Sequence, residues 1–341
     1  MATTPRGTRL AIITPAFHGY HEAFRAAFEA VGADVTVICY DAFTTITKKI
    51  RNKAELELPE RLGIDRSAER ARRLSAPVIA ALREIRPDRV LVIKGDALSD
   101  GFWEELEAMR IPTIVWFYDE MRRMQFSDDR IAAFDKIATY SVHDAAELDR
   151  RGLTVRHIAN GFDTFTPYRE IGHRSETTFI GAAYPNRIEA MQYLHDSDVP
   201  VRAYGRTWSH DWRDRARTWG SDRPAIPAGR DVSRSVAYGI MRGSLASVNS
   251  HFNQDGFTMR TFETPGVGGV HLIDREDIAE LYEPDREVLV YRDLDDLVDQ
   301  VHRLRRDRGL ADRLREAGKR RTLAEHTMVH RAREMERFFA A

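Results

Sequence analysis

The run Arg89-Val90-Leu91-Val92-Ile93 is apolar at every position after the arginine. Such an unbroken run is typical of a central strand in a parallel sheet that helices cover on both faces. Outward from it, similar short runs alternate with longer stretches of helical spacing. The predicted strands are 10–14, 34–40, 112–118 and 136–140, and the predicted helices are 20–31 and 75–85.

The alternation restarts after Asn160-Gly161-Phe162-Asp163, which marks a break in the pattern. A helix is predicted at 187–194, and strands at 177–180, 201–204, 245–248, 270–273 and 288–290. Residues 294–339 have an almost wholly helical pattern, with breaks near Gly309 and His326. The pattern predicts an α/β protein with two doubly wound Rossmann-like domains facing a cleft. Ligands of such domains bind at the carboxyl ends of the strands.

The composition excludes several classes of protein. The chain has 341 residues, more than the ~250–300 at which a single core usually stops growing. Its 52 Lys and Arg against 53 Asp and Glu argue against a dedicated nucleic-acid binder. The single cysteine, Cys39, excludes an internal disulfide and a Cys-rich metal site, and its apolar neighbours predict a buried, inert thiol. No signal peptide and no membrane span is evident, which predicts a soluble cytoplasmic protein.

The stretch from His251 to Gly269 is the most informative for chemistry, because it runs from a loop through a short helix into glycine-rich backbone. Arg260 and Glu263 are three apart and share one helical face. The arginine suits a diphosphate, and the carboxylate suits ribose hydroxyls. The glycines at 266, 268 and 269 would let the backbone approach a ligand closely. A surface Arg–Glu pair that caps a helix fits the same spacing, so both interpretations stay open.

Several motifs in the second half occur in a recognisable order. These are Phe179-Ile180-Gly181, Tyr184-Pro185-Asn186-Arg187, Tyr204-Gly205-Arg206-Thr207-Trp208, a strand ending at Asn249, Arg260-Thr261-Phe262-Glu263 with Gly268-Gly269, and His326-Thr327 with Arg331. In this order they resemble the CgeB-like, spore-maturation-protein branch of glycosyl transferase group 1, which has the GT-B fold. The resemblance extends from about residue 85 to the end of the chain.

This resemblance implies a glycosyltransferase that uses a nucleotide-diphosphate sugar, such as a UDP-sugar, and needs no metal or other cofactor. Residues 1–160 would face the acceptor, residues 161–326 would bind the donor, and residues 327–341 would form a helix that crosses back to the first domain. Glu263 would hold the ribose and Arg260 the diphosphate. The implied donor-binding set is Gly181, Arg187, Gly205, Arg206, Asn249, Arg260, Glu263, Gly268 and Gly269.

The family's Glu-x7-Glu motif is altered in this chain. Seven residues separate Asp255 from Glu263, so the first position is an aspartate. By resemblance Asp255 would contact the donor sugar and join the catalytic set, and the motif favours retention of configuration. The departure from glutamate keeps a different sugar and an accidental match open.

In the first domain, His18 lies in the loop between the first predicted strand and helix, where GT-B enzymes face the acceptor. A neutral histidine there is suited to take the acceptor proton. Asp119 follows another strand and is a second candidate for that role. The remaining acceptor-side candidates are Gly19, Lys94, Asp96 and Trp116. Helix capping and ordinary loop packing are the alternatives for these residues.

Two charged stretches have structural alternatives. Residues 201–235 hold eight Arg against four Asp, which suits either an anionic ligand or, as we favour, a solvated face. Asp293-Leu294-Asp295 mimics a metal-binding motif, but helix capping explains it better.

The sequence leaves the partners open. The acceptor can be a glycan, a protein, a small molecule or a nucleic acid. A GT-B-like binding protein without turnover and a sugar-nucleotide epimerase are alternative functions.

Overall fold

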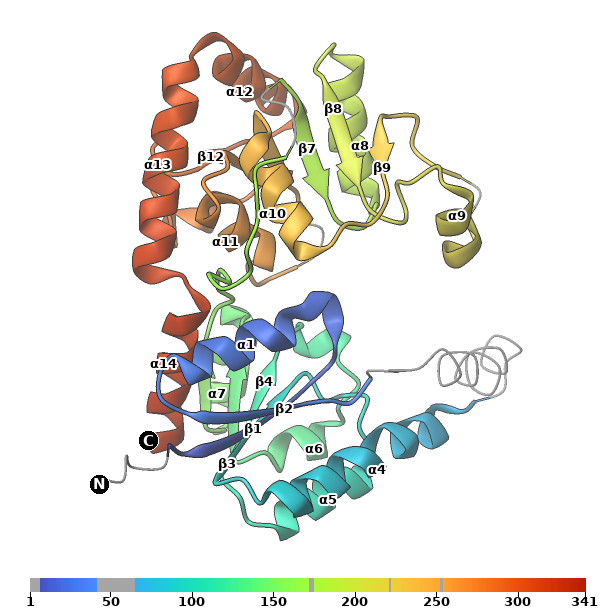
Figure 1. Cartoon of the computed structure of the whole chain (residues 1–341), viewed down its shortest axis with the longest axis vertical. Coiled ribbons are helices and arrows are strands. Elements are labelled where there is room, and N and C mark those ends of the chain that lie inside the picture. The colour runs from blue at the N-terminus through green and yellow to red at the C-terminus, as the bar shows by residue number, and fades with distance from the viewer. Residues whose placement is uncertain (1–6, 42–64, 172–174, 221, 252–253) are drawn as a thin grey trace. The chain divides into compact units, whose positions relative to one another are not determined.

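The computed structural model describes residues 7–41, 65–171, 175–220, 222–251 and 254–341. The chain divides into two compact units: unit 1 comprises residues 1–159 and 331–341, and unit 2 comprises residues 160–330. Each unit is built on one parallel sheet with six strands (Figure 1).

The helices and strands of unit 1 alternate as the apolar runs predict. They are β1 (Arg9–Thr14), a 3-10 turn (Phe17–Gly19), α1 (Tyr20–Glu29), β2 (Asp34–Cys39), α4 (Ser67–Ile85), β3 (Arg89–Ile93), α5 (Asp100–Ala108), β4 (Thr113–Phe117), a 3-10 turn (Met121–Arg123), α6 (Asp128–Ala132), β5 (Lys136–Thr139), α7 (Val142–Arg150) and β6 (Val155–His157).

The unit 1 sheet has the order β2-β1-β3-β4-β5-β6, with all neighbours parallel. In β3, the four residues after Arg89 are completely buried, as expected of a strand covered on both faces. The strand β2 lies at the edge of the sheet and is only partly buried. Cys39 is therefore half-buried, whereas the sequence predicted a buried thiol. Desolvation of this thiol raises its pKa to about 11, which keeps it protonated.

The helix α14 (Met328–Ala340) completes unit 1 with its residues from Arg331 onward. Met335 and Phe338 are buried, and the Glu336 carboxylate lies 2.5 Å from Arg89 at the start of β3. The Lys136 ammonium donates to the carbonyls of Phe338 and Phe339 at the end of the helix. The last helix is therefore an integral part of this unit.

The elements of unit 2 repeat the alternation. They are β7 (Thr177–Ile180), α8 (Pro185–Asp196), β8 (Val201–Tyr204), α9 (Trp212–Thr218), β9 (Ala228–Gly229), α10 (Arg234–Gly243), β10 (Ala246–Asn249), α11 (Met259–Gly266), β11 (His271–Ile273), a 3-10 turn (Glu276–Glu280), β12 (Leu289–Val290), α12 (Leu294–Arg306) and α13 (Arg308–Glu325).

The unit 2 sheet has the order β12-β11-β10-β7-β8-β9, again with all neighbours parallel. This is the strand order of dinucleotide-binding Rossmann domains. The chain leaves β7 toward β8 and later returns to pair β10 with the other side of β7. The point between β7 and β10, where the winding direction reverses, is where ligands of such sheets bind.

Some helices and strands of the structure are not predicted by the sequence pattern. Helix α10 contains Gly239 and Gly243, which lower helix propensity. A Cβ at Gly239 would lie 2.1 Å from the Arg169 carbonyl oxygen, so the glycine permits close packing. The edge strands β6 and β9 span only three and two residues, too short for a periodic signal.

His271 in β11 should make the stability of unit 2 depend on pH. Its imidazole is completely buried, and burial lowers its pKa to about 3. The unfolded chain takes up this proton near pH 6.5, so stability is full above that pH and falls below it, down to about pH 3. We expect His271→Leu to reduce the stability lost between pH 7 and pH 5 by about 2 kcal/mol, measured by urea unfolding. The exposed His210→Leu should leave that loss unchanged.

Candidate functional site

The site in unit 2 forms where the loops after β7 and β10 meet, at the reversal point of the sheet. Arg260, in the first turn of α11, donates from Nε to the Ile180 carbonyl at the end of β7 over 3.2 Å. Asn249, at the end of β10, is buried and donates to the Thr261 hydroxyl over 3.1 Å. These bonds hold the start of α11 against both strand ends.

Arg260 and Glu263 form an ion pair, as their spacing on one helical face allows. The Glu263 carboxylate is completely buried, whereas 30% of the Arg260 side chain is exposed. The Tyr238 hydroxyl donates to the other Glu263 oxygen over 3.3 Å. A buried carboxylate thus anchors a cation whose outer face can receive an anion. The pair is therefore not the surface cap that the spacing left open.

Gly181 and Gly205 follow β7 and β8 and bring these two loops together. A Cβ at Gly205 would lie 2.3 Å from the Gly181 carbonyl oxygen, and the Trp208 indole donates to the same oxygen over 3.0 Å. Close approach of the chain to itself explains both glycines. Their predicted contact with a donor stays a prediction.

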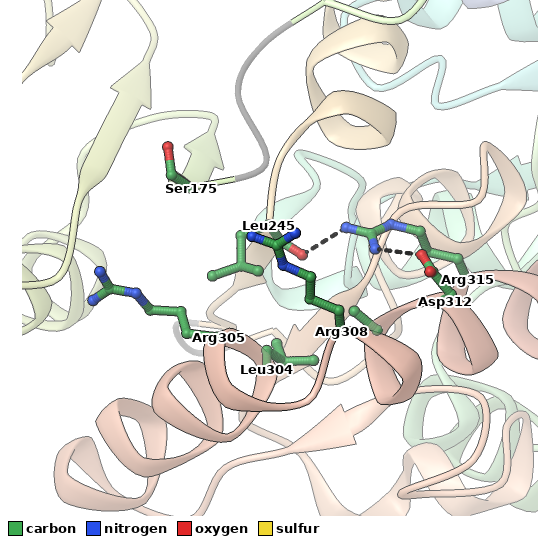
Figure 2. Close-up of a pocket in the computed structure, with 8 residues that line it drawn as sticks. Ser175, Leu245, Leu304, Arg305, Arg308, Asp312 and Arg315 are labelled. Carbon is green, nitrogen blue, oxygen red and sulfur yellow. Dashed lines mark hydrogen bonds and ion pairs between the residues drawn. The ribbon is translucent and has the colours of Figure 1, made fainter.

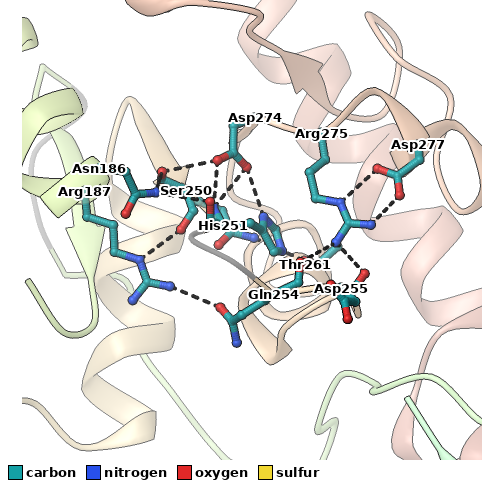
Figure 3. A network of polar contacts seen from close by, with 11 residues as sticks. Asn186, Arg187, Ser250, His251, Gln254, Asp255, Thr261, Asp274, Arg275 and Asp277 are labelled. Atoms are coloured by element: carbon teal, nitrogen blue, oxygen red, sulfur yellow. Dashed lines mark hydrogen bonds and ion pairs between the residues drawn. The ribbon is translucent and has the colours of Figure 1, made fainter. Parts of the chain in front are cut away.

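Arg187 ties the loop after β7 to the loop after β10 (Figure 3). Its Nε donates to the Ser250 carbonyl over 2.9 Å, and its Nη2 lies 3.4 Å from the Gln254 side-chain oxygen. The guanidinium also stacks over the Tyr184 ring at 4.7 Å. This predicted donor residue thus has a clear part in shaping the loop.

A His–Asp pair, with a buried histidine and a partly exposed aspartate, lies beside this arginine, and the sequence did not predict it. Asp274 follows β11 and accepts from the backbone amide of His251, and it lies 3.0 Å from the His251 Nδ1 (Figure 3). The Ser250 hydroxyl donates to the same carboxylate over 3.2 Å. Asp274 directly follows the predicted strand 270–273, and His251 lies three residues after the predicted strand 245–248, so the position after a strand was the signal available in the sequence.

The structure gives Gly268 and Gly269 a packing role, and their predicted contact with a donor stays a prediction. Both follow the carboxyl end of α11 and precede β11, so they lie at the amino ends of the strands, away from Arg260. They are buried, and a Cβ at Gly269 would lie 2.6 Å from the Met241 carbonyl oxygen. Gly266 likewise packs on the ring of Phe162. Close approach of the protein's own atoms explains these glycines.

Most of the arginines between 201 and 235 have acidic partners. Arg206 pairs with Asp231 at 2.9 Å, and four others pair with carboxylates: Arg202, Arg213, Arg230 and Arg234. This favours the solvated, charge-paired interpretation. The Asp293 side chain accepts from the Asp296 amide over 2.8 Å and caps α12, as predicted.

Asp255 is half-buried, and its backbone carbonyl accepts from Arg275 over 2.7 Å. The guanidinium of Arg275 also lies over the Phe257 ring at 4.3 Å. These contacts fasten the loop that precedes α11. The catalytic role of the Asp255 carboxylate stays a prediction.

In unit 1 the predicted acceptor residues follow adjacent strands. His18 follows β1 in a left-handed conformation with φ 45°, and it is exposed, with Gly19 next to it at φ 72°. The Asp41 carboxylate accepts from the Ala16 amide over 2.6 Å and holds this loop. A non-glycine residue in this conformation is strained, and such strain is often found at functional sites.

Lys94 and Asp119 follow β3 and β4 and meet at 3.3 Å. Partial burial is the main cause that raises the pKa of Asp119, and a hydrogen bond with Glu120 is the second. The positive charge of Lys94 opposes this shift. A carboxyl group with a raised pKa is suited to proton transfer. Asp96, also after β3, accepts from the Gln125 amide over 3.3 Å, so the structure gives it a loop-holding contact.

The structure gives Trp116 a position in the core, and its predicted contact with an acceptor stays a prediction. Its side chain lies inside β4 and is 1% exposed, with its ring 5.7 Å from Phe24 and 5.0 Å from Tyr118. All positions of β4 from Ile114 to Phe117 are buried, because helices cover both faces of this central strand. Trp116 therefore belongs to the core.

Over the described residues, no helix combines the length and apolar character needed to cross a membrane. In the same part of the chain, no three His, Cys, Asp or Glu side chains are grouped so that they could hold a metal ion.

Comparison with known proteins is consistent with this geometry. Residues 186–337 match a family model described as glycosyl transferase-like. Spore protein CgeB of Bacillus subtilis (strain 168) is 22% identical over 218 residues, which cover 58% of this chain and 67% of that protein.

Solved structures share the fold across both units. HepE from Anabaena, in complex with UDP and glucose, has a TM-score of 0.63 at 11% identity, covering 98% of this chain and 99% of its own. Sucrose-phosphate synthase from Thermosynechococcus elongatus has a TM-score of 0.61 at 13% identity, covering 98% of each chain. The two Rossmann-like units of the chain therefore have the GT-B-like fold of these structures, and its second half is similar to glycosyl transferase-like proteins and to spore protein CgeB.

Proposed function

We propose that this protein transfers a sugar from a nucleotide-diphosphate donor, and that unit 2 binds the donor. The observation that carries the proposal is the Arg260–Glu263 pair at the reversal point of the unit 2 sheet. The glycosyl transferase-like match over residues 186–337 and the UDP bound in HepE support it. The base of the nucleotide and the identity of the sugar depend on side chains outside this pair.

Donor binding requires an exchange of partners at Arg260. In the described state its guanidinium pairs with the buried Glu263, and its exposed side can turn toward an anion. When Arg260 turns to the diphosphate, one carboxylate oxygen of Glu263 becomes free to accept from the ribose hydroxyls. The same movement would place a cation where charge develops as the diphosphate leaves.

The acceptor side of the proposal rests on unit 1. His18 is exposed in a strained loop, and Asp119 has a raised pKa, so each is suited to contact an acceptor hydroxyl. In a retaining reaction the leaving phosphate can take the acceptor proton. In an inverting reaction His18 would be the base. We propose retention without a metal ion, following the Asp255-x7-Glu263 spacing, and Arg260 would then compensate the leaving charge.

A thermal-denaturation panel of UDP-, GDP-, TDP- and CMP-sugars tests the donor site. One nucleotide sugar at 100 times its dissociation constant should raise the free energy of unfolding of the wild type by about 2.7 kcal/mol. Glu263→Ala and the milder Glu263→Gln should lose most of this ligand-induced shift. The comparison uses the shift, because removal of a buried carboxylate also changes the baseline stability.

Glu283→Ala is the matched control, because Glu283 forms an exposed i,i+3 pair with Arg286 in the same unit. It should keep the full shift. If no nucleotide sugar stabilises the wild type, the donor assignment fails, and a glycan-binding protein without turnover takes its place. Epimerised sugar formed without any acceptor would instead identify a sugar-nucleotide epimerase.

A further inference from the structure

A second pocket in unit 2 lies where the turn between α12 and α13 packs beside the beginning of β10 (Figure 2). Its volume of about 640 Å³ lies within the ~300–1,000 Å³ typical of ligand pockets. The lining residues are Ser175, Leu245, Leu304, Arg305, Arg308, Ala311, Asp312 and Arg315.

The pocket carries an excess of positive charge. Three arginines line it against one carboxylate, Asp312. Arg305 and Arg308 are exposed, and no carboxylate of the described residues lies within ion-pair distance of either. The nearby Asp307 is occupied, because it accepts from the Leu310 amide over 2.9 Å. The net charge of the pocket lining therefore favours an anion.

Arg315 forms a rigid wall of the pocket. It is only 11% exposed and donates to the carbonyls of Ser244 and Leu245 over 2.8 and 3.0 Å. Its other guanidinium nitrogen lies 3.4 Å from Asp312 (Figure 2). A guanidinium held in this way loses little conformational freedom when a ligand binds.

The floor of the pocket is apolar. Leu245 is 7% exposed, Leu304 is fully buried and Ala311 is 3% exposed. An inorganic ion without an apolar part would make no favourable contact with this apolar floor. A ligand with phosphate groups and a flat or apolar body would contact both the arginines and Leu245.

The pocket is separate from the candidate donor site. Ser175 and Leu245 precede β7 and β10, so the pocket lies at the amino ends of these strands. Arg260 and Glu263 lie at the carboxyl ends of the same two strands. A ligand here would therefore bind independently of the donor.

We propose that this pocket binds a polyphosphate-bearing organic anion, with Arg305 and Arg308 contacting the phosphates and Leu245 contacting the body of the ligand. Guanidinium groups suit phosphates because they donate two parallel hydrogen bonds. The site does not depend on the proposed transferase activity, so either can fail alone.

Isothermal titration of the full chain with sodium tripolyphosphate and with ATP, at constant ionic strength, tests this site. Saturable binding is expected, and Arg305→Ala/Arg308→Ala should weaken it at least about tenfold, as loss of charged hydrogen bonds implies. Arg260→Ala should retain this binding. ATP binding about tenfold tighter than tripolyphosphate would support contact between the apolar floor and an organic body, and equal binding of the two would overturn the organic part of the proposal.

Arg306→Ala/Arg320→Ala is the matched control, because it removes the same charge from residues outside the pocket lining. It should change the dissociation constant less than twofold. Equal weakening by both double variants would reduce the effect to general electrostatic attraction and overturn the proposal. Absence of saturable binding to the wild type, or its loss in Arg260→Ala, would also overturn it.

Discussion

Arg260→Ala should lower kcat/KM for sugar transfer by about 10²–10³, the cost typical of removing one donor that stabilises developing negative charge. The guanidinium is the exposed cation at the reversal point of the sheet, and the proposed leaving group carries two phosphates. If Arg260 acts mainly on the leaving group, most of the loss appears in kcat rather than KM. Steady-state kinetics with the donor found by thermal denaturation measures this division.

The Arg260→Ala substitution also leaves the Glu263 carboxylate buried without its cation, which can destabilise the protein. A second variant is therefore needed to separate a loss of catalysis from a loss of folding. Arg260→Lys keeps the positive charge but lacks the planar fork, and it should recover part of kcat. The exposed Arg286→Ala should keep full activity. A loss below threefold in a folded Arg260→Ala protein would remove this residue from the catalytic site.

Deletion of residues 331–341 should destabilise unit 1 by more than about 4 kcal/mol, because truncation of a single buried Met or Phe side chain already costs about 2–5 kcal/mol. The deletion removes the buried Met335 and Phe338 and the partner of Arg89. Since whole domains are stable by only about 5–15 kcal/mol, this loss is a large share of the stability of unit 1. Hydrogen exchange of the amides in β4 and β5 measures the change.

Deletion of Ala341 alone is the control, because that residue is exposed and lies beyond the helix. It should leave exchange in β4 and β5 unchanged. Amides of β10 and β11 should stay protected in both proteins, because unit 2 has its own sheet and core. Unchanged protection in the longer deletion would show that α14 contributes little to unit 1.

Much of the fold could be predicted because buried parallel strands leave a local signal. The runs at 90–93 and 177–180 are apolar or β-branched without interruption, and the strands 89–93 and 177–180 have the predicted bounds. Strands of two or three residues carry no such signal, as β9 shows. In α10 the glycines oppose the helix locally, and only packing against the Arg169 backbone explains them.

The candidate site was harder to predict than the fold, because the same residue pattern can arise for different structural reasons. The spacing of Arg260 and Glu263 predicts a pair on one face, and the pair forms. A glycine-rich run has the same sequence whether its backbone approaches a ligand or the protein itself, and only the structure reveals the close packing of Gly269 on the Met241 carbonyl. Asp274 lies 23 residues from His251 in sequence, and only the pairing of β10 with β11 brings the two together.

The discontinuity of unit 1 along the chain has a consequence for synthesis. A ribosome makes all 171 residues of unit 2 between the last strand of unit 1 and the segment of α14 that completes it. At about 5–20 residues per second, the nascent unit 1 waits roughly 10 to 35 seconds with the surface for Met335 and Phe338 uncovered. The amino-terminal unit is thus the first to be translated and the last to be finished, and this interval is when chaperones would find its apolar surface exposed.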